Sequence, residues 1–255
     1  MRRFLPAVSL ALVLAGMLVA CGTAAPALAD PDEIISQGMK ATSQATSFHV
    51  DVQVTGTVNL QQTGGTFNLD GTTAAGDFDV PGKLARLTFS APGLMGLTGE
   101  VIQIGKDSYV KTSLTGTQYQ KSTTTAADGV QTNPDELFTQ VSGFLDKEGV
   151  ETAKHDDVDC GDAKCYSVSL TVPSSLLADA GSSSGVDIGQ FVGDSLVLNL
   201  QFDRQSLRLS SVATDIDAGE VGTFGLSLTL SKYNEAVHVS PPPSDQVTEG
   251  GGLGL

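Results

Sequence analysis

The hydrophobic positions of this chain follow two different periods, and the change falls near Phe48. Before it, small and apolar residues recur at helical spacing, which predicts a helix from Asp30 or Asp32 to Thr46. Pro31 suits the first turn of that helix, because a helix does not use its first backbone N–H groups. From Phe48 onward the period is two, which is typical of strands with one buried face.

Alternating apolar and polar residues continue to residue 122, interrupted by short turn sequences such as Gly64-Gly65, Pro81-Gly82 and Thr115-Gly116. Short turns between alternating segments predict a meander of antiparallel strands. The predicted strands are 49–60, 66–80, 85–91, 101–104, 108–114 and 118–122.

A second helix is predicted to follow, with Asn133 as its N-cap and Pro134 at its first position. The remaining predicted elements are strands 150–158 and 163–172, a short helix 175–179, and a last meander of strands 196–203, 207–216 and 222–233. Pro241-Pro242-Pro243 is predicted to end the fold, and residues 248–255 are predicted to be a disordered tail.

These elements predict an α+β fold in which a large curved antiparallel sheet, a half-barrel, wraps over two or three helices. Each strand then has one buried face, and the helices cover it. A long twisted sheet around few helices leaves its concave face incompletely filled, which predicts an apolar cavity. The residues predicted to line it are Ile35, Met39, Leu94, Met95, Leu97, Phe138, Val141, Phe144, Leu145, Leu176, Leu177 and Phe191.

The apolar, Gly-rich segment from Ala91 to Leu97 has two interpretations. It is either a mobile lip at the mouth of the cavity or a buried connection between two strands. The sequence favours neither.

The first residues have the features of an export signal: Arg2 and Arg3, then an apolar stretch from Phe4 to Val19. Leu18-Val19-Ala20-Cys21 has the pattern of a lipobox, in which the Cys thiol accepts a diacylglycerol before cleavage. An ordinary secretory signal cut between Ala25 and Ala29 is the alternative. We therefore expect a signal peptide at 1–20, a lipidated tether at 21–30 and one domain at 31–247.

The net charge of the chain limits the classes of partner that it can bind. Removal of residues 1–20 takes two of the 14 basic residues and none of the 29 acidic ones, so the mature chain carries a formal charge of −17. Such a chain lacks the basic patches of nucleic-acid binders and has no charge-based affinity for an anionic lipid surface. Lipid on Cys21 must then supply the membrane contact, on the extracytoplasmic face of the cell membrane.

Cys160 and Cys165 are the other two cysteines, and outside the cytosol such a pair is typical of a disulfide. Four acidic residues lie beside them: Asp156, Asp157, Asp159 and Asp162. They form either a solvated acidic turn or a calcium site, and their spacing matches no EF-hand loop. We predict no metal site and no cofactor.

The sequence contains only weak indications of catalytic residues. Gly181-Ser182-Ser183-Ser184-Gly185 matches the nucleophile elbow formally, but a helix precedes it where the elbow requires a strand. Nothing in the pattern brings His49, His155 or His238 to a nucleophile and an acid. The sequence favours a binding protein over an enzyme, with a hydrolase using Ser183 as the competing hypothesis.

The lipobox, the helix, the alternating strands and the closing stretch resemble the mycobacterial LppX/LprA/LprF/LprG lipoproteins, within the LolA-like group. Tyr233, Asn234, Val237, Val239 and Pro241 carry the most specific match, and Gly105-Lys106-Asp107-Ser108-Tyr109-Val110-Lys111 is also similar. The resemblance covers residues 31–247.

The resemblance implies a half-barrel whose cavity takes lipid acyl chains, in a monomer that carries lipids or lipoglycans across the envelope without catalysis. The expected partners are a lipid or glycolipid, the membrane through the Cys21 anchor, and a membrane transporter. The alternative is an envelope interaction or sensor lipoprotein that uses the curved sheet as a scaffold.

Overall fold

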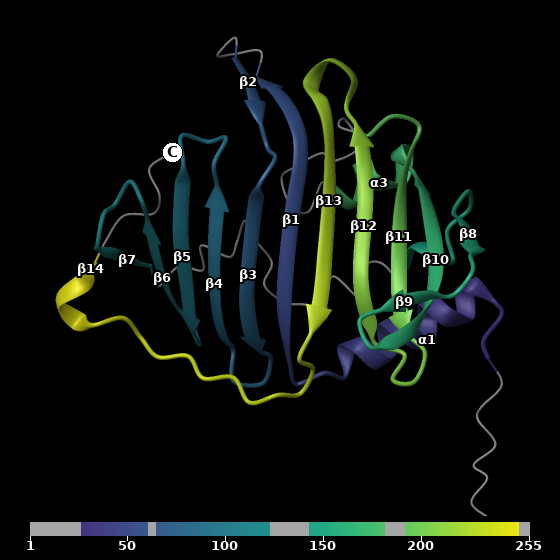
Figure 1. Cartoon of the computed structure of the whole chain (residues 1–255), viewed down its shortest axis with the longest axis horizontal. Coiled ribbons are helices and arrows are strands. Elements are labelled where there is room, and N and C mark those ends of the chain that lie inside the picture. The colour runs from purple at the N-terminus through teal and green to yellow at the C-terminus, as the bar shows by residue number, and fades with distance from the viewer. Residues whose placement is uncertain (1–26, 61–64, 123–142, 182–191, 250–255) are drawn as a thin grey trace, which may run out of the picture.

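A computed structural model describes residues 27–60, 65–122, 143–181 and 192–249. Its centre is one unclosed 14-stranded sheet, antiparallel except at one edge (Figure 1). The strands are β1 (Ser47–Leu60), β2 (Gly65–Asn68), β3 (Thr72–Asp79), β4 (Leu84–Ala91), β5 (Leu97–Ile104), β6 (Asp107–Thr112), β7 (Tyr119–Ser122), β8 (Glu151–Lys154), β9 (Val158–Cys160), β10 (Ala163–Pro173), β11 (Ser195–Asp203), β12 (Leu209–Asp217), β13 (Gly222–Ser231) and β14 (Val247–Glu249).

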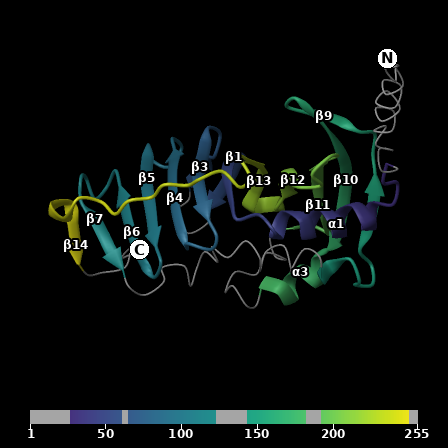
Figure 2. The same cartoon turned by 90° about the horizontal axis from the view of Figure 1, so that it is seen from below.

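The order across the sheet is β14-β7-β6-β5-β4-β3-β1-β13-β12-β11-β10-β8, with β2 paired to β1 and β9 paired to β10. The two meanders therefore meet where β1 pairs with β13, in the middle of the sheet. Two helices, α1 (Pro31–Ser43) and α3 (Ser174–Gly181), lie on one face, which we call the helix face (Figure 2). The opposite face is called the outer face. This architecture confirms the predicted curved antiparallel sheet with helices on one side.

Helix α1 begins where the sequence favours a helix start. The Asp30 carboxylate accepts hydrogen bonds from the backbone N–H groups of Asp32 and Glu33, at 2.9 and 3.4 Å. It thereby satisfies donors that the first helical turn leaves unpaired. The buried face of the helix consists of Ile34, Ile35, Gly38, Met39 and Thr42. The helix ends at Ser43, three residues before the predicted end.

A glycine sets the distance between α1 and the sheet. A Cβ atom on Gly38 would lie 2.3 Å from the Phe202 ring, closer than packed atoms approach. Phe202 is fully buried, and Ile34, Ile35 and Met39 pack around it in the main core cluster. The core therefore lies between α1 and strands β10 to β13, with β1 at its margin.

Several predicted elements differ from the structure. The predicted strand 66–80 is two strands, because the chain turns at Asp70-Gly71 and Gly71 has a positive φ of 80°. The predicted strand 150–158 is divided into β8 and β9, which pair with different parts of β10. Most of the second predicted helix lies outside the described residues.

The C-terminal end of the fold was also predicted wrongly. Pro241-Pro242-Pro243 does not end it: the chain crosses the ends of the strands and adds β14 as a parallel strand beside β7 (Figure 1). The predicted disordered tail is corrected at Thr248 and Glu249, which belong to β14, and its other residues, 250–255, lie outside the described residues. We call residues 232–249 the C-terminal strap.

Candidate functional site

The helix face of the sheet is apolar over most of its width, as the strand register shows. Val52 of β1 pairs with Leu228 of β13, and Val54 pairs with Leu226. Directly paired residues project to the same side of a sheet, so these rows continue from strand to strand. The same face carries Val212 and Ile216 of β12, Leu196, Leu198 and Leu200 of β11, Leu87 and Phe89 of β4, and Val101 of β5.

Charged side chains are sorted to the other face. On the described parts of β1, β3–β7 and β11–β13, the register places no Asp, Glu, Lys or Arg on the helix face. The charged residues of these strands are all on the outer face: Asp51, Asp77, Asp79, Arg86, Glu100, Asp107, Lys111, Lys121, Asp203, Asp215 and Asp217. Over these strands the helix face is therefore uncharged in a strongly acidic protein, whereas at the β8 edge of the sheet Lys154 pairs with Val168 and lies on that face.

The described helices cover this surface unevenly. Helix α1 packs on β8, β10 and β12, and α3 packs on β10 (Figure 2). Burial falls along β1 accordingly: Val50 is 8 % exposed, whereas Val52 and Val54 are half-buried. Leu226, which pairs with Val54, is 39 % exposed. Among the described residues, the apolar surface thus extends beyond the part that the helices fill.

We call this uncovered part the apolar floor. It consists of half-buried or exposed helix-face residues of β1, β12 and β13: Val52, Val54, Ile216, Phe224, Leu226 and Leu228. Val52, Ile216 and Leu228 also pack against the margin of the main core. Contiguous exposed apolar surface is rare on soluble proteins and marks binding sites.

Comparison with known proteins identifies the architecture. No protein-family model and no curated protein matches the sequence. Among solved structures, the lipoprotein LppX of Mycobacterium tuberculosis superposes with a TM-score of 0.53 at 20% identity, covering 83% of this chain and 100% of LppX. LprF of Mycobacterium bovis gives a TM-score of 0.56 at 17% identity, over 83% of this chain and 96% of LprF. The chain has the LppX/LprF fold.

Within the LppX/LprF fold, the predicted cavity residues separate into four groups. Ile35, Met39 and Leu177 are buried in the main core, and Phe144, Leu145 and Leu176 pack against its margin. Leu97 is half-buried at the start of β5. Phe138, Val141 and Phe191 lie outside the described residues.

Leu94 and Met95 are the fourth group, and they correct the interpretation of the segment between β4 and β5. That segment is an exposed turn, in which Leu94 is 36 % and Met95 93 % exposed. Met95 has a positive φ of 55°, which is typical of a tight turn. The segment is therefore not a buried connection.

The residues of the apolar floor were missed by sequence reasoning, although the signal was present. The alternation in 49–60 and 222–233 marks them as one-sided strand residues. The pairing of β1 with β13 could not be predicted from the sequence, because the two segments are some 170 residues apart. This pairing joins them into one surface.

A second buried cluster lies on the outer face, in the half of the sheet that α1 does not reach. Ile102, Tyr109 and Tyr119 are at most 8 % exposed, and Val239 and Val247 of the C-terminal strap pack against them. The strap is held at its start by Asn234, whose side-chain oxygen accepts a hydrogen bond from the Thr46 N–H at 2.8 Å.

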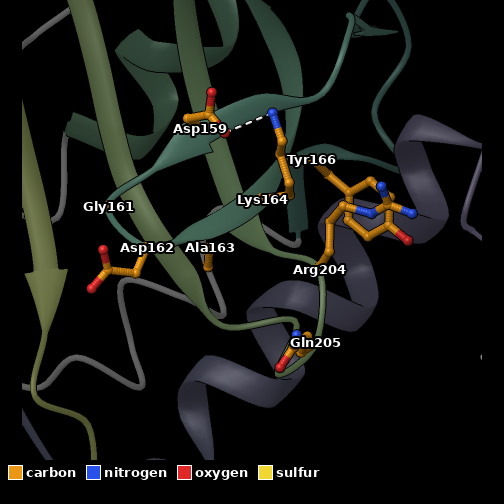
Figure 3. Close-up of a pocket in the computed structure, with 8 residues that line it drawn as sticks. All are labelled: Asp159, Gly161, Asp162, Ala163, Lys164, Tyr166, Arg204 and Gln205. Atoms are coloured by element: carbon orange, nitrogen blue, oxygen red, sulfur yellow. Dashed lines mark ion pairs between the residues drawn. The ribbon is translucent and has the colours of Figure 1, made fainter.

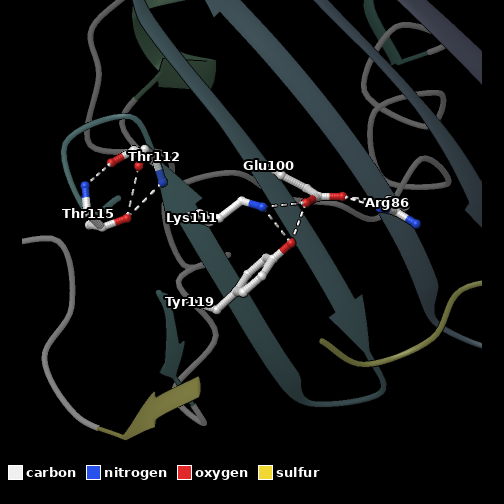
Figure 4. A network of polar contacts seen from close by, with 6 residues as sticks. All are labelled: Arg86, Glu100, Lys111, Thr112, Thr115 and Tyr119. Carbon is white, nitrogen blue, oxygen red and sulfur yellow. Dashed lines mark hydrogen bonds and ion pairs between the residues drawn. The ribbon is translucent and has the colours of Figure 1, made fainter. Parts of the chain in front are cut away.

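A charged network borders that cluster (Figure 4). Arg86 donates through Nε and Nη2 to one oxygen of Glu100, at 2.7 and 2.6 Å. The Tyr119 hydroxyl donates to the other oxygen, and Lys111 Nζ lies 3.4 Å from it and 2.9 Å from the Tyr119 oxygen. Burial alone raises the pKa of Glu100, but the hydrogen bonds from Tyr119 and Arg86 outweigh it, so the pKa lies below its usual value.

The predicted disulfide joins Cys160 to Cys165 at the hairpin of β9 and β10. Beside it is a surface hollow of about 630 Å³ whose lining is half polar and balanced in charge, with Asp159, Asp162, Lys164 and Arg204 among its residues (Figure 3). Two of the four acidic residues here form ion pairs: Asp159 with Lys164 at 2.6 Å, and Asp157 with Lys154 and Arg204 at 2.9 and 3.0 Å. Within the described residues, no three His, Cys, Asp or Glu side chains are grouped as metal ligands.

The histidines are in separate places. His49 Nδ1 lies 2.7 Å from Asp77, and His155 Nε2 lies 3.0 Å from the Ser169 hydroxyl. In the described part of the chain, no carboxylate contacts the other ring nitrogen of His155, so a triad is not assembled there. The candidate nucleophile Ser183 lies outside the described residues.

None of the described helices has the length and hydrophobicity needed to cross a bilayer.

Proposed function

We propose that this protein is a membrane-anchored extracytoplasmic lipoprotein that binds lipid acyl chains on the helix face of its sheet. In this proposal it carries lipids or lipoglycans across the cell envelope and makes or breaks no bond.

The apolar floor is the observation that carries the proposal. Val54 and Leu226 leave hydrocarbon accessible on strands that carry no charge on this face, directly beside the buried main core. Each methylene that moves from water onto such a surface contributes about 0.8 kcal/mol. An acyl chain therefore needs only this face and a cover, with little polar recognition.

Catalysis is not required by this mechanism, because partition of a hydrocarbon chain moves no proton and forms no covalent bond. The site that binds is also remote from the polar contacts: His49 and the Glu100 network are on the outer face. In the proposed carrier, the acyl chain contacts the helix face, on which the hydrophobic residues lie.

The proposed localisation rests on the lipobox and on the similarity of the fold to LppX, which is a lipoprotein. Lipid on Cys21 would keep an acidic domain next to its lipid source, where charge would not. The expected partners remain a lipid or glycolipid, the membrane and a membrane transporter, with the protein as a monomer.

The anchor is tested with Cys21→Ala. We expect the variant to leave the membrane fraction while its thermal unfolding and its lipid binding stay unchanged, because Cys21 belongs to the predicted tether at 21–30 and not to the predicted domain at 31–247. Persistence of the variant in the membrane fraction would contradict the anchor.

Lipid binding is tested by native mass spectrometry of the purified protein, with uptake of a fluorescent fatty acid as the second measurement. Leu226→Glu places a charge on the apolar floor and should reduce uptake at least about tenfold, because a buried carboxylate costs several kcal/mol. Val197→Glu is the matched control: Val197 is 40 % exposed and lies on the outer face of β11. We expect it to bind like the wild type.

Two outcomes would contradict the proposal. One is a protein that neither co-purifies with lipid nor takes up the fatty acid, which would favour the scaffold or sensor alternative. The other is an equal loss of uptake in Leu226→Glu and Val197→Glu, which would show that the binding site is not specific to the helix face.

A further inference from the structure

The C-terminal strap joins the centre of the sheet to its β14 edge. It leaves β13 beside β1, passes the ends of β3–β6 and becomes β14, the strand beside β7 (Figures 1 and 2). Strands β3 to β7 are consecutive in the chain and pair antiparallel, whereas β14 comes from a distant part of the chain and pairs parallel. The strap is therefore an addition to the β3–β7 meander.

The start of the strap is fixed to the centre of the sheet. Tyr233 packs against the main core, and its hydroxyl donates a hydrogen bond to the Leu209 carbonyl at 2.5 Å. The backbone N–H of Asn234 donates to the Ser47 carbonyl at 2.9 Å, and the Ser47 hydroxyl donates to the Glu235 carbonyl. These contacts join the strap to β12 and to the start of β1. Detachment of the strap would therefore begin after residue 235.

Beyond residue 235 the strap is held by few contacts. Within the described residues, its backbone makes no hydrogen bond to the sheet until β14 begins at Val247. Strand β14 has three residues and pairs only with β7. Val239 and Val247 pack on the outer-face cluster, and Pro242 is buried. Segments with few apolar contacts and few backbone hydrogen bonds open at the lowest cost in free energy, so residues 236–249 are the part of the strap that detaches most easily.

The strap covers the best-packed face of β5–β7. Ile102, Tyr109 and Tyr119 lie beneath it and are at most 8 % exposed. The helix face of the same strands carries Val101 and Val110, which are half-buried among the described residues. Without the strap, β5–β7 would keep their ladder hydrogen bonds and the charged network, but no well-packed face among the described residues. Strands that lack a packed hydrophobic face are marginal in water, so we expect β5–β7 to loosen together with the strap.

We propose that the C-terminal strap is a releasable latch: its detachment after residue 235 loosens β5–β7 and opens the β14 edge of the sheet to a ligand that enters or leaves the helix face. The inference rests on the proposed function, because it concerns how an acyl chain reaches the apolar floor. Val239 and Val247 contact the outer face, on which the chain does not lie. The latch therefore sets the rates of entry and exit and leaves the affinity unchanged.

A reversible cross-link tests the latch. Gln120 of β7 and Thr248 of β14 are direct neighbours in the parallel ladder. Adjacent strands lie about 4.8 Å apart, which is within the Cα separation that a disulfide spans. Gln120→Cys with Thr248→Cys is made in the Cys21→Ala background, in which the other two cysteines are already paired.

Uptake and release of a fluorescent fatty acid are followed by stopped-flow fluorescence with the new disulfide oxidised and reduced. We expect both rates to be at least about tenfold slower in the oxidised protein, because the disulfide holds β14 on β7. The dissociation constant should be the same in both forms, since the latch affects entry and exit equally.

Two controls accompany this measurement. Ser211→Cys with Thr229→Cys joins β12 to β13, which the latch does not hold. Its rates should not depend on oxidation. Reductant added to Cys21→Ala alone measures the effect of opening the native Cys160–Cys165 disulfide, and the rates of the cross-linked variant are corrected for it.

Val247→Asp acts in the opposite direction. It places a carboxylate in the apolar contact between β14 and the outer-face cluster, so that the strap detaches more often. We expect both rates to rise at least about threefold. Hydrogen exchange, measured by mass spectrometry without ligand, should become faster in β5–β7 and β14 and stay unchanged in β10–β13. Ser240→Asp, at an exposed position of the strap, is the matched control and should behave like the wild type.

The outcomes separate the two proposals. Failure of the wild type to bind the fatty acid would overturn the acyl-chain proposal together with the role of the latch in ligand entry. Binding with equal rates in the oxidised and reduced cross-linked variant would overturn the latch alone. Faster exchange of Val247→Asp in β14 without any change in β5–β7 would do the same, because the strap would then detach without loosening the strands.

Discussion

The two halves of the sheet bury their hydrophobic residues on opposite faces. In the near half, β8 and β10–β13 with β1, the core lies on the helix face, where Ile34 and Ile35 of α1 meet Phe202. In the far half, β3–β7 with β14, the buried cluster of Ile102, Tyr109 and Tyr119 lies on the outer face, where the C-terminal strap covers it. The same sheet is thus stabilised from two sides.

The difference shows how one sheet can be both stable and open. A strand is stabilised when one of its faces is well packed. In the near half, α1 packs on the helix face of the strands. In the far half the strap and the Glu100 network stabilise the outer face. On the helix face there, Phe78 of β3 packs against the main core, whereas Leu87, Phe89 and Val101 are half-buried among the described residues.

The largest expected effect is on the near half. Phe202→Ala removes a fully buried ring beneath α1 and should lower the free energy of unfolding by about 3–5 kcal/mol. Phe89→Ala removes a half-buried ring from the helix face of the far half and should cost about 1 kcal/mol. Urea denaturation followed by circular dichroism measures both.

Equal losses in the two variants would contradict the comparison. They would mean that the helix face of the far half is packed as tightly as the core under α1. Phe89 would then belong to a core and not to a binding surface.

A smaller effect is expected in the outer-face network. Glu100→Gln removes the charge that Arg86, Lys111 and Tyr119 surround and should destabilise the protein by about 2 kcal/mol at pH 7. The pKa of Glu100 is below its ordinary value of 4.5, so the unfolded chain binds this proton at a higher pH than the folded protein does. The contribution of the carboxylate is therefore complete above about pH 4.5 and is lost as the pH falls through the folded pKa.

The measurement is urea denaturation of wild type and Glu100→Gln at several pH values between 7 and 3. The difference between them should be constant above about pH 5 and should shrink below about pH 4.5. A difference that grows toward acid pH would show that the folded protein holds the proton on Glu100, contrary to this account.

The smallest effect is expected at the rim of the same half. Lys121 pairs with Asp107 at 3.2 Å, and both side chains are partly exposed to solvent. Lys121→Ala should therefore cost less than about 1 kcal/mol, and the loss should fade in 1 M salt. A loss that matches that of Glu100→Gln and resists salt would place Lys121 in the buried network instead.

Local patterns predicted the elements of both halves. The alternation from residue 49 predicted β1, the Pro31 and acidic start predicted α1, and the cysteine spacing predicted the disulfide that the structure contains. Each of these depends on residues close together in the sequence. The antiparallel fold class followed from the same information.

The arrangement of the halves was not predicted. Val101 and Ile102 are adjacent apolar residues that face opposite sides, and only the approach of Val239 and Val247 explains why Ile102 is buried. The strap has no alternating pattern before β14, and its three prolines suggested an end to the fold. Leu94 and Met95 were predicted to line the cavity because they are apolar. They lie instead in an exposed turn that no described residue covers.

The central claim is that lipid lies on the helix face of the sheet, and photocrosslinking tests it most directly. A fatty acid with a diazirine at mid-chain is bound, irradiated and located by peptide mass spectrometry. We predict adducts on Val54, Leu226 and Leu228 of the apolar floor, suppressed by excess unlabelled fatty acid, and none on Val197. Competable adducts concentrated on outer-face residues such as Val197, with the apolar floor unlabelled, would contradict the account.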